Sequence, residues 1–193
     1  MGRLACTAIG SLDGYLADPG GDFRWAAPDA EVHAFVNARV RGVQALLYGR
    51  RTYELMVAWE TDPSLAAAAP ETAEFARLWA QADKIVFSSS LEQVATRRTQ
   101  LRRAFDAEEV RGLVRGADAD VAVSGPTLAA HAWAAGLVDE LQVFLVPLVL
   151  GGGLSFWPPG RTPLVLRDEH RFAGGVVWLR YDVVHPPEAG GDA

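Results

Sequence analysis

The sequence predicts an α/β fold in which helices cover both faces of a mostly parallel central sheet. Three short apolar strands, at residues 44–48, 85–87 and 121–123, are each followed by a turn and then by a helical pattern. Short apolar strands that alternate with helices are typical of a parallel sheet buried on both faces. Two longer apolar stretches, at 141–150 and 176–184, have no helical pattern between them. They indicate an antiparallel strand pair at the C-terminal edge of the sheet.

The first half of the chain is expected to form two strands and three helices, with a small-residue linker before the last helix. Pro28 and Asp29 favour a helix start, and so does the glycine that ends the second strand. The loop after the first strand is rich in Asp, Gly and Pro, which are typical turn residues. In chain order the expected elements are a strand at 3–9, a helix at 28–40, a strand at 44–48, a helix at 51–58, the linker at 66–70 and a helix at 71–82.

The second half is expected to contain more strands than helices. In chain order the expected elements are a strand at 85–87, a short strand within 96–103, a helix at 106–114, a strand at 121–123, a helix from Pro126, and strands at 141–150 and 176–184. The last strand alternates, which places four apolar residues on one side: Val177, Leu179, Tyr181 and Val183.

Length and tail composition predict one domain at residues 1–185 and a disordered tail at 186–193. A domain usually contains about 100–200 residues, so the 193 residues of this chain fit one domain better than two. The tail is small and polar, which is typical of a disordered terminus.

Composition excludes several classes of protein. Hydrophobic residues make up 50% of the chain and charged residues 22%, which excludes a disordered protein. The net charge of −6 argues against binding to nucleic acid or to an anionic membrane. Cys6 is the only cysteine and the four histidines lie far apart, so we expect no disulfide and no metal site. The uncharged run at 141–160 is broken by Pro and Gly, which favours a buried strand and a loop over a membrane helix, so a cytoplasmic protein is expected.

The three strand–turn–helix junctions are the strongest candidates for a binding site. In open α/β sheets, ligands bind beyond the carboxyl ends of the strands, and helix N-termini there offer N–H groups to phosphate. At any one junction, Gly, Ser and Thr are explained equally well as ordinary turn and helix-cap residues. Three in series on one edge favour a phosphate-rich ligand. The junction residues are Gly49, Arg50, Arg51 and Thr52, then Ser88 and Ser89, then Ser124, Gly125 and Thr127.

The familiar nucleotide and hydrolase signatures are absent from the sequence. The glycines at 151–153 are followed by Phe156 where the dinucleotide fingerprint needs glycine, and no helical pattern comes after them. Lys84, the only lysine, follows Asp83, so no phosphate-binding lysine loop exists. No G-x-S-x-G elbow is present either. The sequence therefore excludes a kinase and a serine hydrolase.

Several short motifs together identify a family resemblance that covers the chain from about Arg3 to Val184. They are S-L-D-G-Y-L-A at 11–17, a tryptophan at 25, A-L-L-Y-G-R-R-T-Y-E at 45–54, V-S-G-P-T-L at 123–128 and P-L-V-L-G-G-G at 147–153. This order resembles the dihydrofolate-reductase-like superfamily, and within it the C-terminal reductase domain of the bifunctional riboflavin-pathway deaminase/reductase. The resemblance implies a dihydrofolate reductase-like three-layer α/β/α sandwich, NADPH as cofactor, a small-molecule substrate and a homodimer. The zinc deaminase half is missing, because no H-x-E with P-C-x-x-C occurs.

The resemblance also implies roles for individual residues in cofactor binding. The phosphate-binding turn would be formed by Gly49, Arg50, Arg51 and Thr52, the side facing the adenosine 2′-phosphate by Arg50, Ser88 and Ser89, and a second glycine turn by Ser124, Gly125, Thr127 and Leu128. A mobile loop over the nicotinamide would lie at 13–17, with Ala8 and Leu16 also at the cofactor.

The proton donor and the exact role of the chain stay open at this point. Reduction of a C=N or C=O bond by hydride also needs a proton, and Asp29, Glu31 and Asp13 are the candidate donors by position. The alternatives are a helix cap for Asp29 and a turn residue for Asp13. Trp25 is expected to pack at the border of the substrate pocket. The chain is thus either a reductase acting on a small heterocyclic or carbonyl substrate, or a cofactor-binding module without efficient chemistry.

Overall fold

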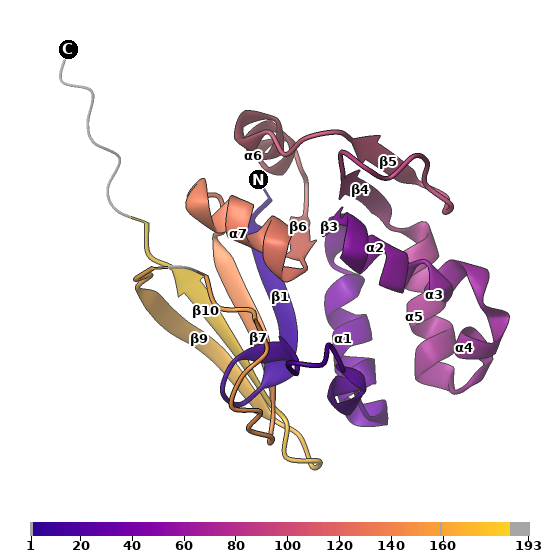
Figure 1. Ribbon diagram of the computed structural model, residues 1–193, viewed down its shortest axis with the longest axis vertical. Coiled ribbons are helices and arrows are strands. Elements are labelled where there is room, and N and C mark those ends of the chain that lie inside the picture. Colours follow the sequence, from indigo (N-terminus) through magenta and orange to yellow (C-terminus); the bar gives the residue numbers. More distant parts are fainter. Residues whose placement is uncertain (1, 159, 186–193) are drawn as a thin grey trace.

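The computed structural model describes residues 2–158 and 160–185 of the chain (Figure 1). Its strands are β1 (Leu4–Ser11), β2 (Tyr15–Ala17), β3 (Val43–Gly49), β4 (Asp83–Phe87), β5 (Thr99–Arg102), β6 (Asp120–Ser124), β7 (Glu140–Val146), β8 (Leu154–Ser155), β9 (Leu164–Arg171) and β10 (Val177–Val183). Its helices are the 3₁₀ helix η1 (Arg24–Ala26) and the α-helices α1 (Ala30–Val40), α2 (Arg50–Met56), α3 (Ala58–Thr61), α4 (Pro63–Ala67), α5 (Pro70–Gln81), α6 (Ala107–Arg115) and α7 (Pro126–Ala134).

Within the described ranges, one eight-stranded sheet runs in the order β5-β4-β3-β6-β1-β7-β10-β9. All pairs from β5 to β7 are parallel, whereas β10 is antiparallel to both β7 and β9. This confirms the predicted α/β fold with a mostly parallel sheet and an antiparallel C-terminal strand pair. A separate two-stranded sheet joins β2 to β8.

Helices cover both faces of the sheet, and the alternation of strand residues shows which face each helix covers. On one face α6 and α7 pack on residues such as Leu47 and Val123. On the other face α5 packs through Trp79 on residues such as Tyr48, while Val32 of α1 packs in a cluster with strand residues at the β7–β10 end. Strands that are buried between two helical layers carry apolar residues on both faces. The short apolar strands of the sequence predicted this arrangement.

Most predicted elements are present within two residues of their expected ends. The linker expected at 66–70 is wrong, because its first two residues belong to helix α4 and its last to α5. Asp62 accepts a hydrogen bond from the Ser64 backbone N–H, and Pro63 stands at the first helical position, so the chain forms α4 before the linker reaches α5. An aspartate N-cap and a proline at the first helical position both favour the start of a helix, and the alanines that follow have high helix propensity.

The C-terminal third contains the other differences between expectation and structure. The strand expected at 141–150 ends at Val146, because Pro147 cannot donate a ladder hydrogen bond. The edge strand β9 was not predicted, and almost all of its residues are exposed, so it carries no apolar alternation. In β10 the most deeply buried residue is Trp178, on the face opposite to the alternating apolar set. The expected tail at 186–193 lies outside the described residues.

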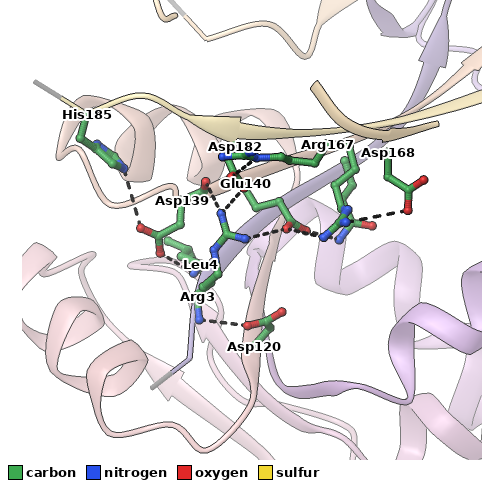
Figure 2. Close-up of polar contacts among 11 residues, drawn as sticks. Arg3, Leu4, Asp120, Asp139, Glu140, Arg167, Asp168, Asp182 and His185 are labelled. Atoms are coloured by element: carbon green, nitrogen blue, oxygen red, sulfur yellow. Dashed lines mark hydrogen bonds and ion pairs between the residues drawn. The ribbon is translucent and has the colours of Figure 1, made fainter. Parts of the chain in front are cut away.

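An ion-pair network ties together the amino ends of β1 and β7 and their neighbours β9 and β10 (Figure 2). The Arg3 guanidinium donates to Glu140 at 3.1 Å and to Asp182 at 2.5 Å, and Asp182 also accepts from Arg167. These donors, with Arg3 first, hold the pKa of Asp182 below its usual range. These ion pairs stabilise the amino edge of β1 and β7, which lies opposite the carboxyl edge where the three junctions are found.

Candidate functional site

The three predicted junctions lie side by side at the carboxyl edge of the sheet. Strands β4, β3 and β6 are neighbours, and their register pairs Gly49 with Phe87 and Tyr48 with Ser124. Each strand therefore ends at the same level, and the turns that follow form one continuous row. The sequence-based placement of these turns on one edge is confirmed.

The first and third junctions are in direct contact. Gly125 has φ +92, and a Cβ built on it would lie 2.1 Å from Thr52 Oγ1. A Cβ on Gly49 would lie 3.8 Å from the Leu128 Cβ. Only glycine adopts the Gly125 conformation without strain, and only glycine leaves room for Thr52. The starts of α2 and α7 are thus packed against each other through residues that both belong to the predicted cofactor set.

Neither α2 nor α7 has a side-chain cap at its start, a property that they share with α3 and α5. Aspartates cap α1, α4 and α6, whereas the N-caps of α2 and α7 are Gly49 and Gly125, which have no side chain to accept a hydrogen bond. The first N–H groups of a helix have no intrahelical partner. Two neighbouring sets of such donors suit an anionic ligand that spans both turns.

Side chains along this row add donors of two kinds. Arg50 and Arg51 are exposed at the start of α2, and among the described residues the Arg50 side chain pairs only with Glu54, in an i,i+4 ion pair of 3.3 Å. Ser89 is exposed after β4, as is Thr127 in the first turn of α7. Guanidinium groups and hydroxyls both bind phosphate oxygens well.

Ser88 differs from its neighbour, because its hydroxyl already has a structural task. The residue is buried, and its Oγ accepts hydrogen bonds from the backbone N–H groups of Ser90 and Leu91 at 3.2 and 2.9 Å. It therefore closes the turn after β4. Ser89 is the better placed of the two serines for contact with a ligand.

At the β1 side of the edge, Asp13 fastens two loops together. Its carboxylate accepts hydrogen bonds from Ser11 Oγ at 2.7 Å, from the Gly151 N–H at 2.7 Å and from the Leu150 N–H at 3.1 Å. These donors, with the Ser11 hydroxyl first, lower the pKa of Asp13. An ionised carboxylate that accepts from this many donors is suited to anchoring the loops, and less suited to donating a proton.

Close glycine contacts complete the interlock between residues 10–17 and 147–157. A Cβ on Gly14, which has φ +93, would lie 2.1 Å from Trp157 Nε1, and a Cβ on Gly153 would lie 2.0 Å from the Ala17 carbonyl oxygen. Strand β2 also pairs with β8. The segment expected as a mobile loop over the nicotinamide is therefore fastened to a second loop along its length. Ala8 and Leu16, also predicted at the cofactor, are half-buried and pack against the core on the α7 face.

Replacing Asp13 by Ala is expected to loosen the loop at 147–153 and to increase its cleavage by a protease. Because the folded-state pKa is depressed, the anchoring in wild type is complete above the ordinary aspartate pKa of about 4 and is lost as pH falls below it. Limited proteolysis at pH 7, with fragments identified by mass spectrometry, measures the effect. Asp118→Ala, a change at an exposed acid away from both loops, is the matched control. Equal cleavage of both variants would contradict the anchoring role.

The candidate acids of α1 lie at the same edge, beside the turn between β9 and β10. Asp29 Oδ1 accepts the Val32 N–H at 2.9 Å and so caps α1, and its other oxygen lies against Gly174. Glu31 Oε2 accepts the Ala173 N–H at 3.0 Å. The capping alternative for Asp29 is thus realised, while Glu31 keeps one oxygen without a protein hydrogen bond among the described residues. Trp25 is half-buried in η1 and donates from Nε1 to the Asp22 carbonyl.

Sequence reasoning missed the residues that hold these turns in place. Ser11 is fully buried and its hydroxyl accepts the Tyr15 N–H at 2.9 Å, while the Gly151 N–H donates to Asp13 at 2.7 Å. The S-x-D-G turn was the available signal, but Gly151 in its partner loop lies 138 residues after Asp13 in the sequence. In the described part of the chain, no cluster of His, Cys, Asp and Glu has the arrangement of a metal site. No helix there has both the length and the apolar character needed to cross a membrane.

Comparison with known proteins links this site to a family. A family model described as the RibD C-terminal domain matches residues 3–178. No curated protein gave a significant match. Among solved structures, a protein assigned to riboflavin biosynthesis in Shewanella sp. PV-4 aligns with a TM-score of 0.72 at 19% identity, covering 95% of this chain and 99% of that one.

Two further solved structures extend the comparison. A pyrimidine reductase-like protein from Corynebacterium diphtheriae has a TM-score of 0.64 at 13% identity, with 96% of this chain and 93% of that one covered. The diaminohydroxyphosphoribosylaminopyrimidine deaminase/5-amino-6-(5-phosphoribosylamino)uracil reductase of Thermotoga maritima has a TM-score of 0.61 at 16% identity, covering 95% of this chain and 57% of that one. At these identities the likeness establishes the shared fold.

Proposed function

The chain belongs to the RibD C-terminal domain family of the dihydrofolate-reductase-like superfamily, and from this premise we propose that it is an NADPH-dependent reductase. The substrate would be a small heterocyclic, carbonyl or imine compound. The observation that carries the proposal is the row of three junctions at β4, β3 and β6, with two helix starts left without side-chain caps. A dinucleotide is the phosphate-rich ligand that such a row fits.

The residues of this row fit NADPH in chemistry and in shape. Gly49, Gly125 and Thr52 form a cradle that a Cβ at 125 would fill. Arg51, Thr52 and the N–H groups at the start of α2 would hold the pyrophosphate. Arg50 and Ser89, exposed on neighbouring junctions, would meet the adenosine 2′-phosphate.

When bound, the cofactor would supply a hydride, and the chain itself would supply position and a proton. The interlocked loops at 10–17 and 147–157 would form the wall of the site at β1 and β7. Glu31 would deliver the proton to the substrate heteroatom, because Asp29 is occupied as a helix cap and Asp13 as an anchor. Trp25, which lies in η1 shortly before α1 in the chain, would border the substrate.

The proposal is tested by following NADPH absorbance at 340 nm while the protein is incubated with a panel of imines, carbonyl compounds and amino-uracils. Consumption of NADPH that depends on both protein and substrate supports the reductase. A protein that consumes no NADPH with any member of the panel, although it binds the cofactor, supports the second candidate function.

That second candidate is a cofactor-binding module without efficient chemistry. It is favoured by the fact that two of the three candidate acids have structural tasks, Asp29 as a cap and Asp13 as an anchor. The S-x-D-G motif and the acid near Trp25 would then be explained by folding alone. Binding of NADPH without turnover distinguishes this module from the reductase.

We also propose that the protein forms a homodimer, as the family resemblance implies. Of the uncharged stretch 141–157, Leu141 and Val143 are buried in the chain's own core, whereas Trp157 is 45% exposed. Apolar residues of β9 and β10 continue on the same face, where Leu166 pairs with Tyr181 and is 48% exposed. A cavity of about 300 Å³ lined by Trp133, Leu141, Trp157 and Leu164 opens there. Exposed apolar patches of this kind are typical of interaction sites.

Light scattering at micromolar concentration should give about twice the mass of one chain. Leu166→Lys, which places a charge on the proposed face without touching the core, should shift the protein to the monomer. A wild-type protein that is monomeric throughout would overturn the proposal.

A further inference from the structure

The row of strand ends at the carboxyl edge continues past the three junctions, because β5 lies beyond β4 in the sheet (Figure 1). Strand β5 is parallel to β4, and its last residue, Arg102, pairs with Phe87. Phe87 pairs in turn with Gly49 at the end of β3. Three neighbouring strands therefore end in line, and the first residues after them are Arg103, Ser88 and Arg50.

This alignment places an arginine on each side of the turn that follows β4. Neighbouring strands lie about 4.8 Å apart, so the backbones at Arg50 and Arg103 are about 10 Å apart, with the turn between them. The turn carries Ser89, which is exposed. A group bound above Ser89 is therefore flanked by two long cationic side chains, one from the β3 side and one from the β5 side.

The Arg103 side chain contacts this turn directly. Its guanidinium donates to the carbonyl oxygen of Leu91 and, at 3.4 Å, to that of Glu92. The Leu91 N–H donates in turn to Ser88 Oγ at 2.9 Å, the bond that closes the turn. The positive charge of Arg103 is thus held against the segment that presents Ser89.

The charge of Arg103 is not neutralised within the described ranges. Both partners of its guanidinium are uncharged carbonyls, and no carboxylate there forms an ion pair with it. A guanidinium has five N–H groups, so donors remain for a ligand. Its neighbour differs, because Arg102 forms an ion pair with Glu109 at 2.6 Å. Asp106, three residues after Arg103, caps α6 by accepting backbone N–H groups.

The 2′-phosphate of NADPH carries more charge than one guanidinium can neutralise. A phosphate monoester has a charge of about −1.5 to −2 at pH 7, and Arg50 supplies a single positive charge. We propose that Arg103 is a second determinant of the preference for NADPH over NADH, and that it binds the 2′-phosphate from the β5 side while Arg50 binds it from the β3 side. This inference rests on the proposed reductase function and its cofactor.

The test is calorimetric titration of NADPH and of NADH into the full chain, as wild type, Arg103→Ala and Arg102→Ala. Arg103→Ala should weaken NADPH binding by about 10-fold, the lower end of the effect of a hydrogen bond to a charged group, because the side chain is exposed. NADH lacks the phosphate and should lose little affinity. Arg102→Ala is the matched control and should leave the ratio of the two affinities unchanged, since Glu109 already neutralises that arginine.

A second variant separates the charge of Arg103 from its contact with the turn. Arg103→Gln keeps an amide donor for the carbonyls of Leu91 and Glu92 but removes the charge, so it should show the same selective loss of NADPH affinity. Equal losses for both nucleotides would make Arg103 a structural clamp and overturn the inference, as would an unchanged ratio. A wild-type protein that binds neither nucleotide would instead overturn the proposed function, so the two failures are distinguishable.

Discussion

Replacing Glu31 by Gln is expected to lower kcat by about 10²-fold while the affinity for NADPH stays nearly unchanged. General-acid catalysis contributes about 10²–10⁴-fold, and the amide cannot deliver a proton to the substrate heteroatom. The amide keeps an oxygen that can accept the Ala173 N–H, so the contact with the turn between β9 and β10 is retained. Steady-state kinetics on the active substrate, together with a cofactor titration, measure both quantities.

Asp29 provides the matched control, because it is an acid of the same turn with a different task. Asp29→Ala removes the cap of α1 and should cost about 1 kcal/mol, which lowers Tm by about 2–4 °C in a protein of this length. Its kcat should stay within a few-fold of wild type. If Glu31→Gln turns over normally and only stability changes in both variants, neither acid of α1 is the proton donor.

Replacing Arg50 by Ala should weaken NADPH binding by about 10–100-fold. A hydrogen bond to a charged group is worth about 1.5–3 kcal/mol, and about 1.4 kcal/mol corresponds to a factor of ten. The ion pair between Arg50 and Glu54 is exposed and spans one helical turn, so breaking it to bind the 2′-phosphate costs only about 0.3–0.5 kcal/mol. NADH lacks this phosphate and should lose little affinity.

The ratio of the two affinities identifies the group that Arg50 binds. Equal losses for NADPH and NADH would make Arg50 a pyrophosphate-binding or structural residue. Arg115→Ala, at an exposed arginine in the last turn of α6, is the control and should change neither affinity. That helix end lies next to the start of β6, at the opposite edge of the sheet.

The predictable parts of this molecule are those encoded by local sequence. The compact strands at β3, β4 and β6 are apolar on both faces, and each is followed by turn residues and a helix, so their common edge follows from the topology of parallel sheets. The role of Asp29 as an N-cap was likewise open to prediction, because the signal lies within four residues.

The missed parts depend on contacts between distant segments or on exposed strands. Strand β9 is stabilised by pairing with β10 rather than by burial, so its sequence resembles a charged loop. The anchoring of Gly151 by Asp13 and the contact of Gly125 with Thr52 join residues far apart in the chain. Local patterns identify such residues as turn formers but not their partners. For the same reason the sequence alone left three candidate proton donors open, since the partners of Asp13 and Glu31 lie far away in the chain.

The central claim is that the row of junctions binds NADPH, and titration of the wild-type protein with NADPH, followed by quenching of tryptophan fluorescence, tests it most directly. The account predicts saturable quenching with a Kd well below 1 mM and weaker binding of NADH. A wild-type protein that binds neither nucleotide below millimolar concentration would contradict it.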